Sequence, residues 1–196
     1  MKQIVASSNG IELIESPAPI CGSREICVEV NYSFISTGTE LATLEQVQES
    51  SSNISKHVIS NPNLIKKVGS KISAKGIQST LKDINQYVSK RKAQTYKLTP
   101  LGYSVSGKVI SVGEDVTTFN EGDLVACAGA TLATHSEIVC VPENLSAHIP
   151  SGCDLQSASS VAVGSIAMHA IHQSQLRLGE HILIVGLGTV GFITAQ

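Results

Sequence analysis

The stretch that most constrains the fold of this chain is its last sixteen residues, HILIVGLGTVGFITAQ. An apolar run over 181–185 precedes glycines in a G-x-G-x-x-G pattern, and an apolar helical pattern follows them. In a dinucleotide-binding loop the first glycine allows a tight turn, the second lets the backbone approach a pyrophosphate, and the third lets helix and strand pack closely. We therefore predict a strand over 181–185 and a nucleotide-binding loop. Its predicted cofactor-binding residues are Gly186, Gly188, Thr189, Val190 and Gly191.

One strand and one helical turn cannot form a doubly wound sheet, because an apolar strand alone has two unpaired edges and two uncovered faces. We expect the chain to hold only the start of a cofactor domain, with the remainder beyond Gln196. The acidic residue that binds the ribose lies about 20 residues after such a loop. The choice between NAD and NADP is therefore left open.

Strand patterns fill residues 1–44 and 99–150, and Asn9-Gly10 between two such patterns predicts a hairpin. Small residues dominate 154–176 and predict one or two closely packed helices before the glycine loop. We expect two domains, 1–150 and 151–196, of which the second is incomplete.

Residues 45–97 differ from their surroundings, because apolar residues recur there at helical spacing. Residues 56–97 carry ten Lys or Arg and one acidic residue, Asp83, whereas the rest of the chain is acidic. This predicts a basic helical insertion. Its charge fits either a solvated face that pairs with the acidic body or a surface for an anion or partner.

Composition excludes several classes of protein. The formal net charge of −2 and the scarcity of aromatic residues among the lysines argue against nucleic-acid binding. The five cysteines are scattered and odd in number, which favours reduced thiols in the cytoplasm over a disulfide framework. No apolar run is long enough for a signal core or a membrane span, so we expect no membrane association.

Four stretches carry a resemblance to a known family: VNYSFISTGTE, LGYSVSGKVISVGEDVTTFNEGDLVA, HSEIVCVPENLSAHIP and LRLGEHILIVGLGTVG. Together they resemble the medium-chain dehydrogenase/reductase superfamily, the relatives of zinc alcohol dehydrogenase and quinone reductase. The resemblance implies an α+β, mostly β fold: a GroES-like β-barrel domain with a helical insertion, followed by the truncated start of a Rossmann domain. It also implies hydride transfer with NAD or NADP.

The zinc ligands of that superfamily are missing at the matching positions. Thr37-Gly38-Thr39-Glu40 stands where zinc members carry a cysteine motif, and Gly102-Tyr103-Ser104 stands where they carry Gly-His-Glu. The four-cysteine structural zinc lobe is also absent from the sequence. A catalytic zinc needs three protein ligands, so we expect no zinc.

Without zinc, another group must polarise the substrate oxygen. The resemblance places Tyr103 at a ligand position, where its phenol could donate a proton, and Thr39 at the position of a proton-relay hydroxyl. We predict Thr39 and Tyr103 as catalytic residues. Alternatively, Tyr103 packs its ring into the core and Thr39 holds a turn. We expect His135 to be a surface histidine, and Cys127 and Cys140 to be small buried residues in strands.

The STGTE motif followed by a lysine-rich helical stretch and LGYS resembles zinc-less bi-domain oxidoreductases, which often act among polysaccharide-biosynthesis proteins. That resemblance implies a small-molecule substrate, a further C-terminal dehydrogenase-like domain and a homo-oligomer formed through the cofactor domain. The alternative from another class is a non-catalytic binding or scaffold module that retains a dehydrogenase fold.

Overall fold

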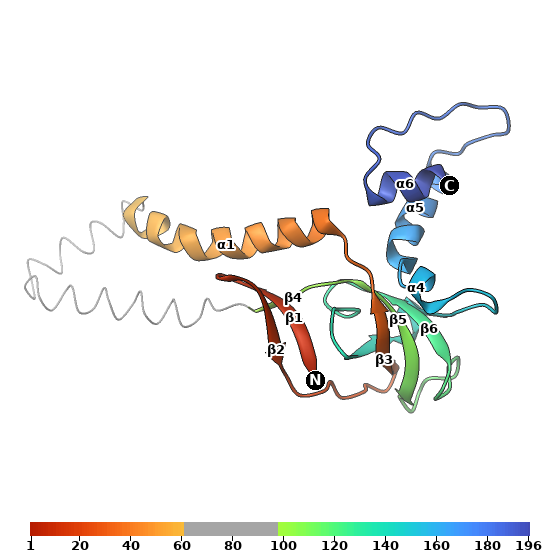
Figure 1. Ribbon diagram of the computed structural model, residues 1–196, viewed down its shortest axis with the longest axis horizontal. Coiled ribbons are helices and arrows are strands. Elements are labelled where there is room, and N and C mark those ends of the chain that lie inside the picture. The colour runs from red at the N-terminus through yellow and green to blue at the C-terminus, as the bar shows by residue number, and fades with distance from the viewer. Residues whose placement is uncertain (61–97) are drawn as a thin grey trace, which may run out of the picture. The chain divides into compact units, whose positions relative to one another are not determined.

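A computed structural model describes residues 1–60 and 98–196 of the chain (Figure 1). The basic insertion predicted over 45–97 therefore lies largely outside the described residues. In chain order, the structure has β1 (Lys2–Ser7), β2 (Gly10–Glu15), β3 (Glu25–Ser33), α1 (Thr37–Ser60), β4 (Thr99–Pro100), β5 (Ser104–Val112), β6 (Leu124–Ala128), β7 (Ile138–Pro142), a 3₁₀ turn (Glu143–Leu145), β8 (Ser146–His148), α4 (Leu155–Ala158), α5 (Val161–Gln173) and α6 (Thr189–Ala195).

The chain divides into two compact units. The first contains Met1–Ile4, Leu13–Glu40 and Pro100–Gln196, and the remaining described residues belong to the second. Every feature of the candidate site described below lies in the first unit. The domain boundary that we expect near residue 150 stays a prediction.

A five-stranded antiparallel sheet with the order β7-β3-β5-β6-β8 forms the body of the first unit. Alternating aliphatic residues on its strands point to one face, as the period of a strand requires. Together with Cys127 on β6 and with Phe119 and Ala133 from loops, they form a continuous core of buried side chains, whose aliphatic strand residues are Ile26, Val28, Val105, Val109, Val125, Val139 and Val141. The predicted burial of Cys127 is thus confirmed, and burial raises the pKa of its thiol to about 11.

The hairpin predicted at Asn9-Gly10 is confirmed, because β1 ends at Ser7 and β2 begins at Gly10, whose φ is +126°. Strands β1, β2 and β4 form a second sheet with the order β2-β1-β4. Of the one or two helices expected within 154–176, the structure has two, α4 and α5.

The strand pattern assigned to residues 1–44 ends too late, because α1 begins at Thr37. The start of this helix is fixed by side chains of its own first turn. The Glu40 carboxylate accepts a hydrogen bond from the Ser36 amide at 3.0 Å, and the hydroxyls of Ser36 and Thr39 lie 3.3 Å apart. The Glu40 carboxylate thus satisfies the amide of the residue that precedes the helix, and this cap overrides the β-branched character of the segment.

The expectation that all five cysteines are reduced is wrong for two of them. Cys27 on β3 lies directly opposite Cys140 on β7, and a disulfide joins them. Cys140 is therefore not the free small residue that we expected. The sequence could not indicate this pair, because 113 residues separate the two cysteines and only the strand register brings them together.

Candidate functional site

The glycine loop has the geometry that its motif requires. Gly186 has a φ of +94°, a backbone conformation that only glycine adopts readily. A Cβ on Gly191 would lie 2.0 Å from the Gly186 carbonyl oxygen, so the third glycine is needed for close packing of α6 on the loop. A Cβ on Gly188 would meet no described atom within 4 Å. The second glycine therefore faces open space, on the side where a pyrophosphate could approach the backbone.

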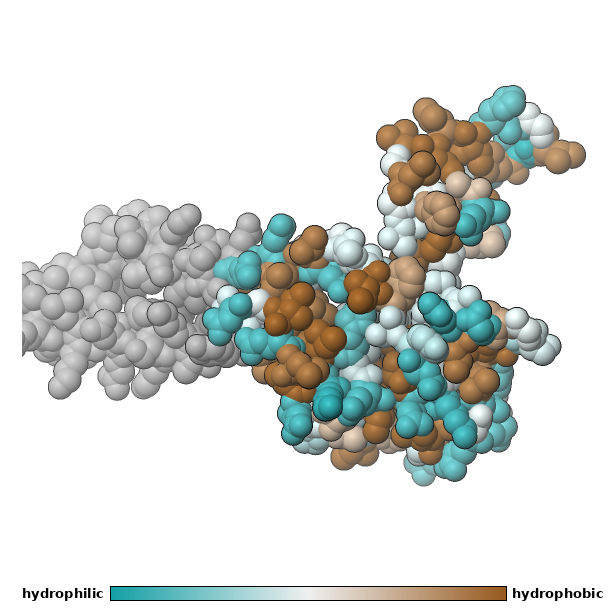
Figure 2. All heavy atoms as spheres, in the orientation of Figure 1, coloured by the Kyte–Doolittle hydropathy of each residue, from teal (hydrophilic) through white to brown (hydrophobic). Residues whose placement is uncertain are grey.

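The strand predicted over 181–185 is not formed in the structure, which gives this segment no strand pairing among the described residues. Its apolar side chains are instead exposed, as Leu183 at 86% and Val185 at 90% show. Figure 2 shows a concentration of hydrophobic residues over this end of the chain. A central strand of a parallel sheet is stabilised by neighbours on both edges and by helices on both faces. The described residues provide neither for this segment.

A hollow of about 580 Å³ lies where the end of β3 meets α4 and the start of α6. Thr189 of the glycine loop belongs to its wall, as do the last two residues of β3 and the two residues that follow the strand. The lining residues are Tyr32, Ser33, Phe34, Ile35, Gln156, Ser157, Ser159, Ser160, Thr189, Phe192 and Ile193. The hollow thus joins the predicted cofactor loop to the edge of the β domain and offers aromatic rings beside several hydroxyl groups.

Helices α4 and α5 are held against β5 by serine hydroxyls. The hydroxyl of Ser104 donates to the Ser159 carbonyl at 2.6 Å and accepts from the Ala162 amide at 3.1 Å. The Ser106 hydroxyl donates to the Leu155 carbonyl. Ser104 and Ser106 are fully buried, so these bonds satisfy polar groups that would otherwise be costly to bury. Ser104 therefore has a structural role at the position where zinc members of the superfamily carry a glutamate.

The two predicted catalytic residues lie on separate elements. Thr39 is exposed on the first turn of α1, and Tyr103 is half-buried immediately before β5. The Tyr103 carbonyl accepts a hydrogen bond from the Gly129 amide at 2.9 Å, which fixes its backbone. Neither residue lines the hollow beside Thr189. Their catalytic roles accordingly stay predictions.

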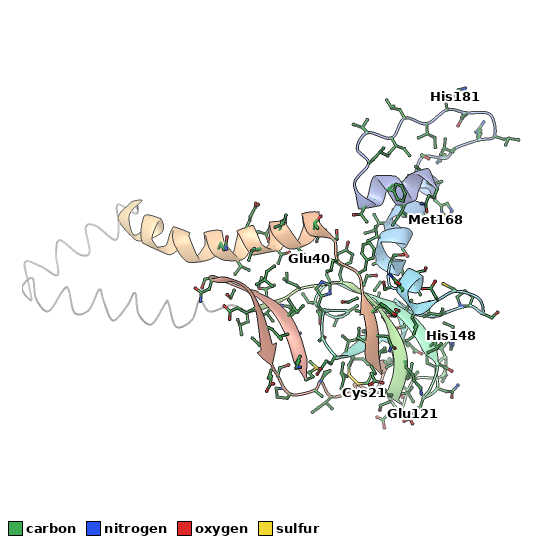
Figure 3. The ribbon with its side chains drawn as sticks, in the orientation of Figure 1. Cys21, Glu40, Glu121, His148, Met168 and His181 are labelled. Carbon is green, nitrogen blue, oxygen red and sulfur yellow. A yellow bond between two sulfur atoms is a disulfide. The ribbon has the colours of Figure 1, made fainter. Side chains whose placement is uncertain are left out.

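The structure brings together a pair of groups that the sequence does not indicate, Glu40 and His135. The Nε2 atom of His135 lies 3.1 Å from Oε1 of Glu40, and His135 is only 6% exposed. The expectation of a surface histidine is therefore wrong. The pair is 95 residues apart in the chain, so no local pattern could have predicted it. Figure 3 shows Glu40 at the start of α1.

Backbone contacts hold the His135 ring in place. The His135 amide donates to the Leu101 carbonyl, and its own carbonyl accepts from the Ile4 amide, both at 2.8 Å. Gly102 has a φ of +93°, and a Cβ there would lie 2.9 Å from Nδ1 of His135. Nδ1 is buried and has no hydrogen-bond partner among the described residues. A hydrogen on Nε2, pointing at the Glu40 carboxylate, fits these contacts, because a hydrogen on Nδ1 would have no acceptor there.

We expect the substitution Glu40→Ala to lower the free energy of unfolding by about 1–3 kcal/mol, because it leaves a buried N–H of His135 without an acceptor. Denaturant unfolding followed by circular dichroism measures the change. Glu40→Gln should cost much less, since the amide oxygen can still accept from Nε2. Glu45→Ala, at an exposed position of the same helix, is the control and should stay within about 0.5 kcal/mol of wild type. Equal stabilities for Glu40→Ala and Glu45→Ala would refute the role of the pair.

Among the helices that the structure describes, none is both long and apolar enough to cross a membrane.

The sheet, the helices that follow it and the glycine loop define a GroES-like domain leading into the start of a Rossmann domain. The sequence profile described as "Alcohol dehydrogenase GroES-like domain" matches residues 67–176, more than half of the chain. The chain therefore belongs to this family. The predicted membership of the medium-chain dehydrogenase/reductase superfamily and the predicted GroES-like fold are both confirmed.

Curated relatives include a quinone oxidoreductase of Pseudomonas aeruginosa, 36% identical over 99 residues, which are 49% of this chain and 30% of that protein. A D-guloside 3-dehydrogenase of Escherichia coli is 31% identical over 96 residues, which are 49% of this chain and 27% of that protein. The chain thus spans about a third of the length of the curated relatives that it matches.

Solved structures show the same fold at lower identity. Galactitol-1-phosphate dehydrogenase of Escherichia coli superimposes with a TM-score of 0.67 at 16% identity, over 99% of this chain and 51% of that chain. Quinone oxidoreductase of Escherichia coli, complexed with NADPH, superimposes with a TM-score of 0.57 at 14% identity, over 89% of this chain and 41% of that chain.

Proposed function

We propose that the full-length protein is a metal-independent, NAD(P)-dependent oxidoreductase that transfers hydride to or from a carbonyl, an alcohol or an activated alkene. The observation that carries the proposal is the glycine loop. Gly186 adopts a left-handed conformation, Gly191 packs on the loop backbone, and Gly188 faces open space. These are the three separate demands that a pyrophosphate-binding turn makes on its glycines.

The loop residues fit a dinucleotide. We propose that the backbone amides of Thr189 and Val190 bind the diphosphate, next to the open side of Gly188. The hollow that contains Thr189 also has the aromatic and hydroxyl groups of β3 and α4 on its wall, and it provides room for the cofactor beside the β domain. When bound, the nicotinamide supplies or accepts the hydride. The solved relative complexed with NADPH supports this choice of cofactor class.

We propose that there is no catalytic zinc because of the side chains that stand at the zinc-ligand positions. Tyr103 and Ser104 replace two residues of the zinc members' Gly-His-Glu motif, and Thr39 lies in the run that replaces their cysteine motif. The Ser104 hydroxyl is already engaged by two backbone groups. These residues provide neither thiolate nor imidazole, the ligands that zinc prefers. We propose that Tyr103 donates the proton to the substrate oxygen and that Thr39 relays it.

We propose that the substrate is a small carbonyl compound or alcohol. Sugars and polysaccharide precursors are one candidate class of such substrates. The relatives include a quinone oxidoreductase, a sorbitol dehydrogenase of Halalkalibacterium halodurans and a D-guloside 3-dehydrogenase, which supports this range. We further propose a cytoplasmic homo-oligomer in which more of a parallel sheet, and then a second dehydrogenase-like domain, follow this chain. The exposed Leu183, Val185 and Leu187 support a covering sheet, because together they form an uncovered apolar strip.

Turnover by the full-length protein tests the proposal. Oxidation of NADH or NADPH should be followed with quinones, aldehydes and keto sugars, in the presence and absence of a metal chelator. We expect activity that survives chelation. Tyr103→Phe and Thr39→Ala should each lower kcat by roughly 10²–10⁴-fold, the usual contribution of a positioned proton donor, with cofactor affinity unchanged.

Thr117→Ala, at an exposed position of the same unit, is the matched control and should leave kcat unchanged. Full activity in both catalytic variants would show that Thr39 and Tyr103 are not catalytic, but it would leave the proposed oxidoreductase activity in place. Cofactor binding without turnover of any of these substrates would instead favour the alternative, a scaffold module that retains a dehydrogenase fold.

A further inference from the structure

Three cysteines converge on the face of the five-stranded sheet that points away from its core. On β3, Ile26 and Val28 point into the core, so Cys27 between them points to the other face. The same alternation on β7 places Cys140 on that face, between Val139 and Val141. The register pairs Cys27 with Cys140, which explains why their sulfur atoms meet.

The third cysteine, Cys21, comes from the loop that leads into β3. Its thiol donates to the Glu25 carbonyl at 3.1 Å, and the Gly22 amide donates to the Glu25 carboxylate at 3.0 Å. A Cβ on Gly113 would lie 2.1 Å from the Gly22 carbonyl oxygen, so the loop lies directly against the end of β5. Close backbone packing on both sides of Cys21 therefore fixes its position over the sheet.

The three sulfur atoms lie within 4.8 Å of one another. Cys27 is buried and Cys21 is half-buried, so the cluster is covered by protein but can be reached from solvent. In Figure 3 the yellow sulfur atoms gather beside the labelled Cys21. By contrast, Cys127 is buried in the core and Cys153 is exposed on a turn, and neither belongs to this cluster.

We propose that Cys21, Cys27 and Cys140 form a binding site for one zinc ion when the Cys27–Cys140 disulfide is reduced. Tetrahedral zinc with Zn–S distances of about 2.3 Å needs sulfur atoms about 3.8 Å apart. The Cys21 sulfur therefore needs a shift of about 1 Å. The sulfur atoms of Cys27 and Cys140, which start bonded to each other, need rotation of their two side chains once the disulfide is opened. Solvent occupies the fourth position. The site uses no residue of the proposed catalytic or cofactor-binding groups and does not depend on the proposed function.

The disulfide is the metal-free, oxidised form of this site. A phosphine reductant opens it by taking up the oxygen of one water molecule, and the two sulfur atoms receive the two protons and two electrons as thiols. Zinc then replaces the protons of the three thiols. Burial raises the pKa of the Cys21 thiol, and the Glu25 carboxylate raises it further, against hydrogen bonds that lower it. Because zinc replaces the protons of the thiols, its binding should release protons and weaken as the pH falls.

The test uses the full-length protein, reduced with a phosphine, desalted without oxygen and titrated with Cd²⁺, whose bonds to thiolates absorb in the ultraviolet. Competition with Zn²⁺ follows. We expect one Cd²⁺ to bind per chain with thiolate absorption, and an excess of Zn²⁺ to compete for the same site. Cys21→Ser keeps the disulfide pair and should raise the Kd of this site at least roughly 100-fold. Mutating a residue that only hydrogen-bonds to a metal ligand already lowers metal affinity about 10–100-fold.

Cys153→Ser removes an exposed, unpaired thiol and is the matched control, with an unchanged Kd. Reduced wild type that takes up no Cd²⁺ with thiolate absorption would overturn the proposal. So would a Cys21→Ser variant with wild-type affinity, or a Cys153→Ser variant that loses the site. Thermal unfolding of the oxidised variants, expected to match wild type, excludes misfolding as the cause of any loss.

Discussion

The substitution Gly188→Asp should weaken binding of NADH and NADPH to the full-length protein at least roughly 100-fold, or about 2.7 kcal/mol. The side chain would enter the open space beside the loop, where we place the diphosphate, and would bring a like charge against it. Gly188 has φ −69° and ψ −175°, an extended conformation that any residue adopts. Aspartate is also a favoured residue at a helix N-cap, so the variant should fold normally. Isothermal titration calorimetry measures the two affinities.

Gly188→Asn is the matched control for this experiment. Asparagine has nearly the same volume and the same capping ability, but it carries no charge. We expect an intermediate loss of affinity, so the difference between the two variants measures the electrostatic part of the effect. Wild-type affinity in Gly188→Asp would show that no phosphate binds at this turn.

The substitution Gly107→Ala should lower the free energy of unfolding by about 3 kcal/mol, at the upper end of overpacking effects. Gly107 on β5 lies opposite Val30 on β3, and a Cβ there would lie 2.0 Å from the Glu29 carbonyl oxygen. That contact is with backbone, so the β3–β5 pairing at the centre of the sheet must shift. For a domain of this size the loss corresponds to a fall in Tm of roughly 6–12 °C.

Differential scanning calorimetry of the wild type and the variant measures this change. Gly164→Ala in α5 is the control, because a Cβ there meets no described atom within 4 Å. It should stabilise the helix by up to about 1 kcal/mol. A Gly107→Ala variant with the Tm of wild type would mean that the central strands are not packed as described.

Local patterns predicted the elements whose cause is local. The hairpin at Asn9-Gly10, the helices within 154–176, the left-handed conformation of Gly186 and the close packing at Gly191 follow from turn chemistry, helical spacing and backbone sterics. The start of α1 at Thr37 was missed because the capping contacts of Ser36 and Glu40 outweigh a β-branched pattern. The strand over 181–185 was predicted from its apolar run, but a strand also needs pairing partners, which the described residues do not provide.

The parts of the site that the sequence did not indicate depend on contacts between distant segments. Glu40 meets His135, and Cys27 meets Cys140, only because antiparallel register and the return of the chain after β6 place them together. Neither pair has a characteristic spacing in the sequence. The predicted residues Thr39 and Tyr103 were taken from positions in a family motif, and the structure assigns them to an exposed helix start and a half-buried loop.

The most direct test of the central claim is a crystal structure of the full-length protein with NADH or NADPH bound. We predict diphosphate oxygens within hydrogen-bond distance of the backbone amides of Thr189 or Val190, resting against Gly188. A cofactor bound elsewhere, with this turn closed by side chains, would contradict the assignment of the chain to a nicotinamide-dependent enzyme.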